Sequence, residues 1–219
     1  MALNASTGTI TNAVTFSNTG TLALGASAGS LTFNGGLTAT APSASTLKGT
    51  ITSSNDPITF GAITLGADTT INTVATTNVA DLTIGAVTGA TYNLTLATGG
   101  VAGAEIAGTS VAGVGTLTIT NSGGTTFSST VNATTVTLTN TTGTIAFNGA
   151  LTATTLNTAA QAYNLALNAS TGTITNAVSM INTGTVTLGT SGGTLAFTGG
   201  LTATAPSGIS LSGTLSTNS

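Results

Sequence analysis

A long internal repeat constrains this chain more than any other feature. Residues 2–14 and residues 166–178 share one thirteen-residue sequence, Ala-Leu-Asn-Ala-Ser-Thr-Gly-Thr-Ile-Thr-Asn-Ala-Val. The match continues at the same 164-residue offset, and nearly two thirds of the positions in 1–55 are identical to their counterparts in 165–219. The chain is therefore one 164-residue repeat followed by the opening third of the next. A repeat of this kind indicates an array or a fibre.

Within the repeat, short segments alternate apolar and small polar residues, as in Leu22–Leu24, Leu82–Ile84 and Leu94–Leu96. This is the period of a half-buried strand, in which alternate side chains point to opposite faces. Clusters of Gly, Asn and Ser separate the segments and are typical of turns. No long apolar stripe with helical spacing occurs, and Gly and Thr at this density are unfavourable for helix. The sequence predicts an all-β fold.

A second motif follows several of these segments and contains a phenylalanine, as in 29–33, 143–147 and 193–197. Five of the six Phe residues occupy this position, so we expect them to stack above one another in a core. About eight units fit into the repeat, or roughly 20 residues per unit, which lies within the range of solenoid repeats. An antiparallel sandwich of hairpins remains the alternative. The Asn-Gly pairs at 34–35 and 148–149 suit either a hairpin turn or a solenoid corner.

The recurrence of Val, Ile, Leu, Phe, Thr and Asn at regular spacing favours stacked coils over hairpins. We therefore predict a right-handed parallel β-helix (β-solenoid) with roughly 20 residues per coil, continuous over 1–219. Eight coils at about 4.8 Å each would give the repeat an axial length near 40 Å.

The composition excludes most kinds of catalytic site. Charged residues make up 2% of the chain, and there is no His, Cys, Arg or Trp. Without His or Cys no Ser-His or Cys-His nucleophile pair can form. The acids that could serve a glycosidase or a calcium site are scattered, and we interpret Asp56, which precedes a proline, as a turn residue. We expect no enzyme, no catalytic, cofactor or metal site and no cofactor; the acids are Asp56, Asp68, Asp81 and Glu105.

The same composition limits the partners. One lysine, Lys48, cannot form the basic patch on which nucleic-acid binding depends. No run of 18 apolar residues occurs, so we expect no membrane-spanning helix. The Asn-x-Ser/Thr triplets at Asn4, Asn93, Asn132, Asn140 and Asn168 match glycosylation acceptors but arise by chance in such a sequence. A nearly uncharged surface favours self-association, so we expect the partner to be the chain itself.

Threonines alternate with apolar residues in 135–139 and 171–175, and on a solenoid they would form outward rows. Stacked rows of this kind can bind ice. A regular array on one flat face would favour that function, whereas threonines scattered over all faces would count against it.

Residues Ile58–Gly66 and Gly143–Leu151, together with Gln161–Leu165, resemble the repeats of filamentous-haemagglutinin-like and giant autotransporter-type surface proteins. The resemblance implies a right-handed β-helical shaft, export to the cell surface and a role in adhesion or fibre formation. We therefore expect a non-enzymatic, extracellular structural fibre or adhesin shaft that stacks head to tail with itself and contacts other cells or surfaces. The alternative is a binding module, either an adhesin or an ice-binding threonine face.

Overall fold

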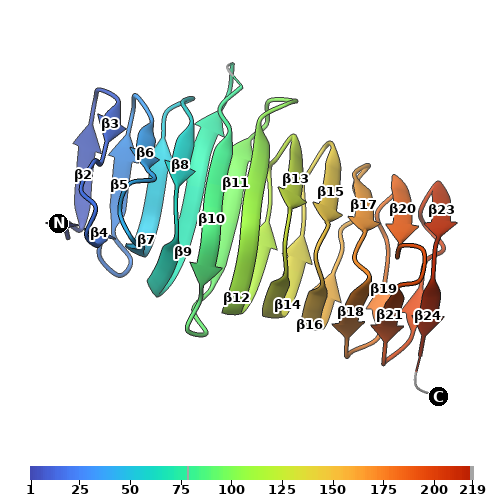
Figure 1. Cartoon of the computed structure of the whole chain (residues 1–219). Helices are drawn as coiled ribbons and strands as arrows, with labels where there is room; N and C mark the ends of the chain where they lie inside the picture. Colours follow the sequence, from blue (N-terminus) through green and yellow to red (C-terminus); the bar gives the residue numbers. More distant parts are fainter. Residues whose placement is uncertain (78, 218–219) are drawn as a thin grey trace.

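The computed structural model describes residues 1–77 and 79–217 and forms a β-solenoid, a rod of stacked coils with the two termini at opposite ends (Figure 1). It has about ten turns of about 21 residues each, and all its strand pairs are parallel. The prediction of an all-β parallel solenoid is confirmed, and the hairpin sandwich is excluded. Among the described residues there is no helix, and so none long and apolar enough to cross a membrane.

Each turn contributes strands to three stacks, which we call the first, second and third faces in chain order. The first face contains β1 (Ala2–Leu3), β4 (Leu22–Leu24), β18 (Thr171–Ile174), β21 (Thr194–Phe197) and β24 (Thr214–Ser216). The second contains β2 (Thr7–Ile10), β5 (Ser30–Phe33), β11 (Leu94–Gly99), β19 (Val178–Ser179) and β22 (Leu201–Thr202). The third contains β3 (Val14–Thr15), β6 (Leu37–Ala39), β8 (Ile58–Phe60), β13 (Gly124–Phe127), β15 (Thr144–Phe147), β17 (Asn164–Leu167), β20 (Thr185–Leu188) and β23 (Gly208–Leu211).

Six longer strands turn a corner and belong to more than one face. Four run from the first face onto the second: β7 (Ser45–Ser53), β9 (Ile63–Ala75), β14 (Val131–Leu138) and β16 (Leu151–Asn157). The other two start on the third face: β10 (Leu82–Thr88), which reaches the first, and β12 (Glu105–Ile119), which passes over all three.

The core lies inside the coil and is built by the alternation read from the sequence. In β4 the side chains of Leu22 and Leu24 are fully buried, whereas Ala23 between them is partly exposed. The same pattern recurs from turn to turn, so each apolar side chain packs on its counterparts in the turns before and after. Because neighbouring parallel strands lie about 4.8 Å apart, this stacking fills the interior without a second layer.

Glycine is required where consecutive corners approach closely. Gly49 has φ +69°, and a Cβ there would lie 2.5 Å from the carbonyl oxygens of both Ala26 and Gly29. At Gly35, in one of the two Asn-Gly pairs, a Cβ would clash with the backbone nitrogen of Ala13. These glycines therefore sit at solenoid corners, where only a bare backbone fits against the preceding turn.

The 164-residue repeat does not contain a whole number of turns. Ala2–Leu3 lie on the first face of the first turn, whereas their counterparts Ala166–Leu167 lie on the third face of the eighth. The repeat thus covers seven and two-thirds turns, one face short of the eight coils predicted. The prediction missed this because turn length varies: the turn that joins the paired Leu47 and Leu65 is short, whereas the turn that joins the paired Ile71 and Leu96 is considerably longer.

The same variation overturns the predicted single stack of phenylalanines. Phe33 lies on the second face and Phe197 on the first. Within residues 1–77 and 79–217, Phe127 and Phe147 are the one stacked pair, with ring centroids 5.7 Å apart and planes 10° apart. Gly108 lies in register with Phe127 in the turn before, and a Cβ there would clash with the Phe127 ring.

Hydroxyl groups also enter the interior, at the corner that follows the second face. The Thr98 hydroxyl donates to the carbonyl of Ala104 at 2.6 Å, and the Thr73 hydroxyl donates to the carbonyl of Ala80 at 2.6 Å. Both threonines are fully buried. Each hydroxyl satisfies a carbonyl of the loop that leads to the third face, so it anchors that loop to the core.

Candidate functional site

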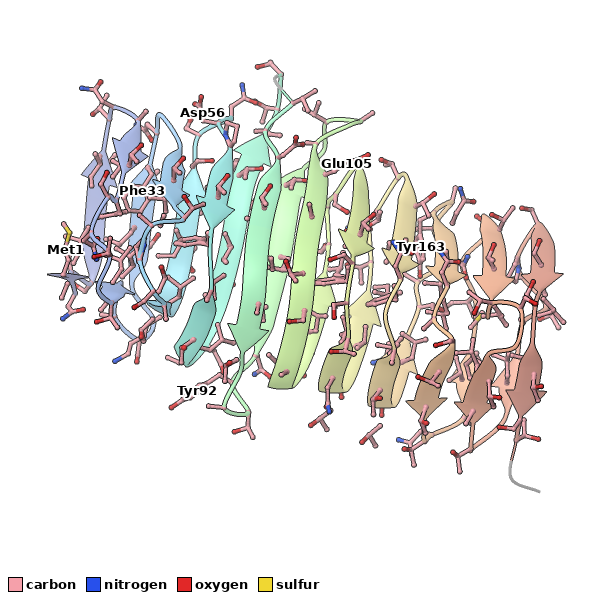
Figure 2. The ribbon with its side chains drawn as sticks, viewed as in Figure 1. Met1, Phe33, Asp56, Tyr92, Glu105 and Tyr163 are labelled. Atoms are coloured by element: carbon pink, nitrogen blue, oxygen red, sulfur yellow. The ribbon has the colours of Figure 1, made fainter. Side chains whose placement is uncertain are left out.

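The acidic residues are spread along the rod, and two of them, Asp68 and Asp81, form hydrogen bonds between turns. Asp68 accepts hydrogen bonds from the backbone N–H and the side-chain amide of Asn93, at 2.9 and 3.1 Å. Asp81 accepts one from the backbone N–H of Glu105 at 2.9 Å. In each case the carboxylate bonds to the following turn, so it links coils. Asp56 and Glu105 lie at the upper edge of the rod in Figure 2.

Within residues 1–77 and 79–217, no three His, Cys, Asp or Glu side chains come together in a way that could hold a metal ion. Asparagines bridge turns in the same manner as the acids. Asn168 donates its side-chain amide to Asn148 Oδ1 at 3.0 Å, and Asn93 Oδ1 accepts from the backbone N–H of Thr116 at 2.8 Å. Two of the five glycosylation triplets, at Asn93 and Asn168, are thus tied into ladders between coils.

The second face carries the longest outward row of hydroxyl-bearing side chains. The row is continuous in register over seven turns and consists of Thr7, Ser30, Thr50, Thr70, Thr95, Thr118 and Thr137; in the eighth turn the amide of Asn157 takes the same position. A neighbouring row starts with Thr9, Thr32 and Thr52, and the hydroxyls of the last two are hydrogen-bonded at 3.1 Å. Rows two residues apart along a strand lie about 7 Å from each other, and turns repeat at about 4.8 Å. The neighbouring row continues with Asn72 and is interrupted by the buried Ala97, so the polar array is two rows wide over the first four turns.

The other faces are less regular. The outward row of the third face is interrupted by alanines at Ala107, Ala146 and Ala166. The two threonine segments singled out from the sequence, 135–139 and 171–175, lie on the second and the first face. The structure thus brings them onto different sides of the rod. Threonines occur on all three faces, with one extended array among them.

A groove of about 580 Å³ runs over the corner beside this array. Its floor includes Thr50, Thr70 and Thr95, and one wall is the loop that carries Tyr92. The Tyr92 side chain is 39% exposed and projects at the lower edge of the rod (Figure 2). The lining thus combines threonine hydroxyls, the carboxylate of Asp68 and an exposed phenol. Sequence reasoning missed Tyr92, although it is one of only two tyrosines and lies in a turn-forming segment.

The two ends of the rod form the third candidate surface. At the C-terminal end the side chains of Ile209 and Leu211 are 45% and 61% exposed. At the N-terminal end Ile10 is 36% exposed, whereas its counterpart Ile174 is buried. In the described residues the strands of the end turns pair on one side only, so each end presents unpaired backbone groups beside apolar side chains. Such edges are templates for a further strand.

Comparison with protein-family models, with curated proteins and with solved structures found no match.

Proposed function

We propose that this chain is a segment of a non-enzymatic, extracellular structural fibre, built by head-to-tail stacking of β-solenoid copies in the manner of filamentous-haemagglutinin-like surface proteins. One observation carries the proposal. Leu211, exposed at the C-terminal end, is the repeat counterpart of Leu47, which is fully buried inside the rod. The end of the chain thus places at the surface a residue whose repeat counterpart is buried in the interior.

Composition supports the same function. With charged residues at 2% of the chain, repulsion between copies is weak, and a surface of this kind favours association. The hydrogen-bonded acids and asparagines reinforce contacts between coils, as a mechanical shaft requires. Location outside the cell is proposed from the resemblance of the repeats to those of surface proteins.

The proposal is tested by negative-stain electron microscopy of the purified chain at increasing concentration. Rods are expected to lengthen by end-to-end stacking, because stacking buries Leu211 and pairs the open edges. The variant Leu211→Asp is expected to remain as single rods. The matched variant Thr126→Asp, which places the charge on an exposed side position, is expected to lengthen like the wild type. Single rods of the wild type at the highest concentration would contradict stacking between separate chains.

A second candidate function, ice binding, is favoured by the array on the second face. The row that begins with Thr7 and the neighbouring row that begins with Thr9 lie side by side on the second face. A flat ice-binding surface requires such a repeat in two dimensions. The purified chain would then show thermal hysteresis in a nanolitre osmometer. Thr95→Lys, in the middle of the longest row, would abolish the hysteresis, and Thr126→Lys on the third face would leave it intact.

A further inference from the structure

The C-terminal end of the rod repeats an interior turn on all three faces. By the 164-residue offset, three apolar residues of its last turn correspond to Leu37, Leu47 and Ile51, and a fourth, Ile209, occupies the position of Ser45. Those three interior side chains are fully or almost fully buried. Their counterparts at the end are Leu201, Leu211 and Leu215, and all three are exposed or half-buried.

The interior side chains are buried because the following turn covers them. Three residues of that turn lie in register, one on each face. The register pairs are Leu37 with Ile58, Leu47 with Leu65, and Ile51 with Ile71. The cover is thus a single coil, residues 56–72.

The backbone of the end turn also repeats the interior. Leu188 pairs with Leu211 as Leu24 pairs with Leu47, and every strand pairing between the first two turns recurs at the same offset. A coil that fits over Leu47 therefore meets the same strand arrangement over Leu211. Both the apolar side chains and the open strand edges of this end match a partner that the chain itself encodes.

We propose that the C-terminal end is a docking surface for a further copy of the 164-residue repeat, which enters at the residue equivalent to Asp56 and is turned by one face of the solenoid. This inference rests on the proposed fibre and specifies its internal contact. In the new copy Leu65 covers Leu211 on the third face, although within this chain Leu65 lies on the first. Ile58 and Ile71 shift from their own faces in the same sense, over Leu201 and Leu215.

The one-face shift determines in which direction each copy in a fibre displays its threonine row. The hydroxyl row of one copy lies on the second face, and its counterparts in the next copy, Thr171, Thr194 and Thr214, lie on the first. A third copy would place the row on the third face. A fibre of such copies therefore displays its threonine array and its groove in three directions in turn, and only every third copy has the same orientation.

The test uses a chain in which residues 56–164 are appended directly after Ser219. Because the sequence has no cysteine, a labelling variant contains a single thiol and a cross-linking variant contains two. In the 219-residue chain, Leu211→Cys is expected to react rapidly with a thiol reagent. In the extended chain its reaction is expected to slow by at least about 100-fold, because a covered thiol reacts only when the coil opens. Thr126→Cys, far from the end, should react equally fast in both chains.

Cross-linking tests the one-face shift. Paired residues in adjacent parallel strands are about 4.8 Å apart, within the range that a disulfide bridges. Leu211→Cys is expected to oxidise with a Leu65→Cys substitution in the appended copy, and not with Ile58→Cys in that copy. The inference is overturned if the Ile58→Cys pair forms instead, or if Leu211→Cys stays as reactive in the extended chain as in the original.

These outcomes are independent of the fibre assay. If separate chains fail to lengthen but Leu211→Cys is covered in the extended chain, the docking surface holds and stacking of separate chains fails. If separate chains lengthen while Leu211→Cys stays open in the extended chain, the fibre holds and the docking partner is wrong.

Discussion

Leu211 pairs in register with Leu188 at the C-terminal end of the rod, in the arrangement by which Leu47 pairs with Leu24 inside it. Leu47 and Leu211 are repeat counterparts, and they differ in what lies on their other side. Leu47 is covered by the next coil and fully buried, whereas Leu211 is 61% exposed. The covering coil over Leu47 thus accounts for its burial, and no such coil lies over Leu211.

Truncating the two leucines should therefore have unequal effects. Leu47→Ala removes a buried side chain and leaves a cavity, and we expect the free energy of unfolding to fall by about 2–5 kcal/mol. Leu211→Ala should change it by less than about 0.5 kcal/mol, because the side chain is largely in water. Urea denaturation of both variants and the wild type measures the difference. Equal losses would mean that Leu211 is buried in solution.

The corner at Gly49 should tolerate no side chain. Gly49→Ala forces φ +69° on a residue with a Cβ and brings that atom within 2.5 Å of two carbonyl oxygens. We expect a loss of at least about 2 kcal/mol in the free energy of unfolding. Gly20→Ala is the matched control, since a Cβ at Gly20 has no neighbour within 4 Å, and it should be nearly neutral. Thermal unfolding followed by circular dichroism compares the two; a neutral Gly49→Ala would refute the close corner contact.

The buried hydroxyls should contribute more to the free energy of unfolding than the exposed ones. Thr98→Val keeps the shape of the side chain but leaves the carbonyl of Ala104 without its donor at a buried position, at a cost of about 1–3 kcal/mol. Thr95→Val changes a partly exposed hydroxyl on the outer face and should cost far less. Denaturant unfolding, together with hydrogen exchange of residues 100–104, reports both stability and loop anchoring. Similar values for the two variants would show that the Thr98 hydroxyl bond is not formed.

Tyr163 should make stability depend on alkaline pH. Burial raises the pKa of the Tyr163 phenol above its usual value of 10.0, although hydrogen bonds from the Ala159 backbone and Thr158 partly oppose this. The unfolded chain therefore loses this proton at a lower pH than the folded chain does. The contribution is fully present below about pH 10 and is lost as pH rises through the folded pKa.

The measurement is the free energy of unfolding from pH 8 to pH 11.5, for the wild type and for Tyr163→Phe. The variant loses the bond in which the Tyr163 hydroxyl accepts from the Ala159 N–H at 3.1 Å, so it should be less stable at neutral pH. Its stability should fall less steeply above pH 10. Parallel curves for the two proteins would contradict the role of Tyr163.

The sequence predicted the class of fold because its signals are local and repeated. Alternation in segments such as Leu94–Leu96 marks strands, and identical segments one repeat apart require stacked equivalents. It could not predict which face a given motif occupies. That assignment depends on the summed lengths of all preceding turns, so a difference of a few residues per turn moves Phe33 and Phe197 onto different faces.

The candidate surfaces were likewise predictable from the sequence only in part. The outward threonines were predicted as rows, but their concentration on the second face depends on register between turns. The groove beside Tyr92 is lined by residues from several successive turns, and no short motif encodes it. The buried position of Thr98 was missed because threonine in a strand is usually exposed, and only the fold of the following loop shows what its hydroxyl bonds to.

The most direct test of the fibre is helical reconstruction by cryo-electron microscopy of the native material. Seven and two-thirds turns at about 4.8 Å each predict an axial repeat of about 37 Å per copy, with each copy turned by one face relative to the last. Three copies would then return the pattern to its starting face after about 110 Å. Isolated short rods, or an axial repeat of eight whole turns without rotation, would contradict the account.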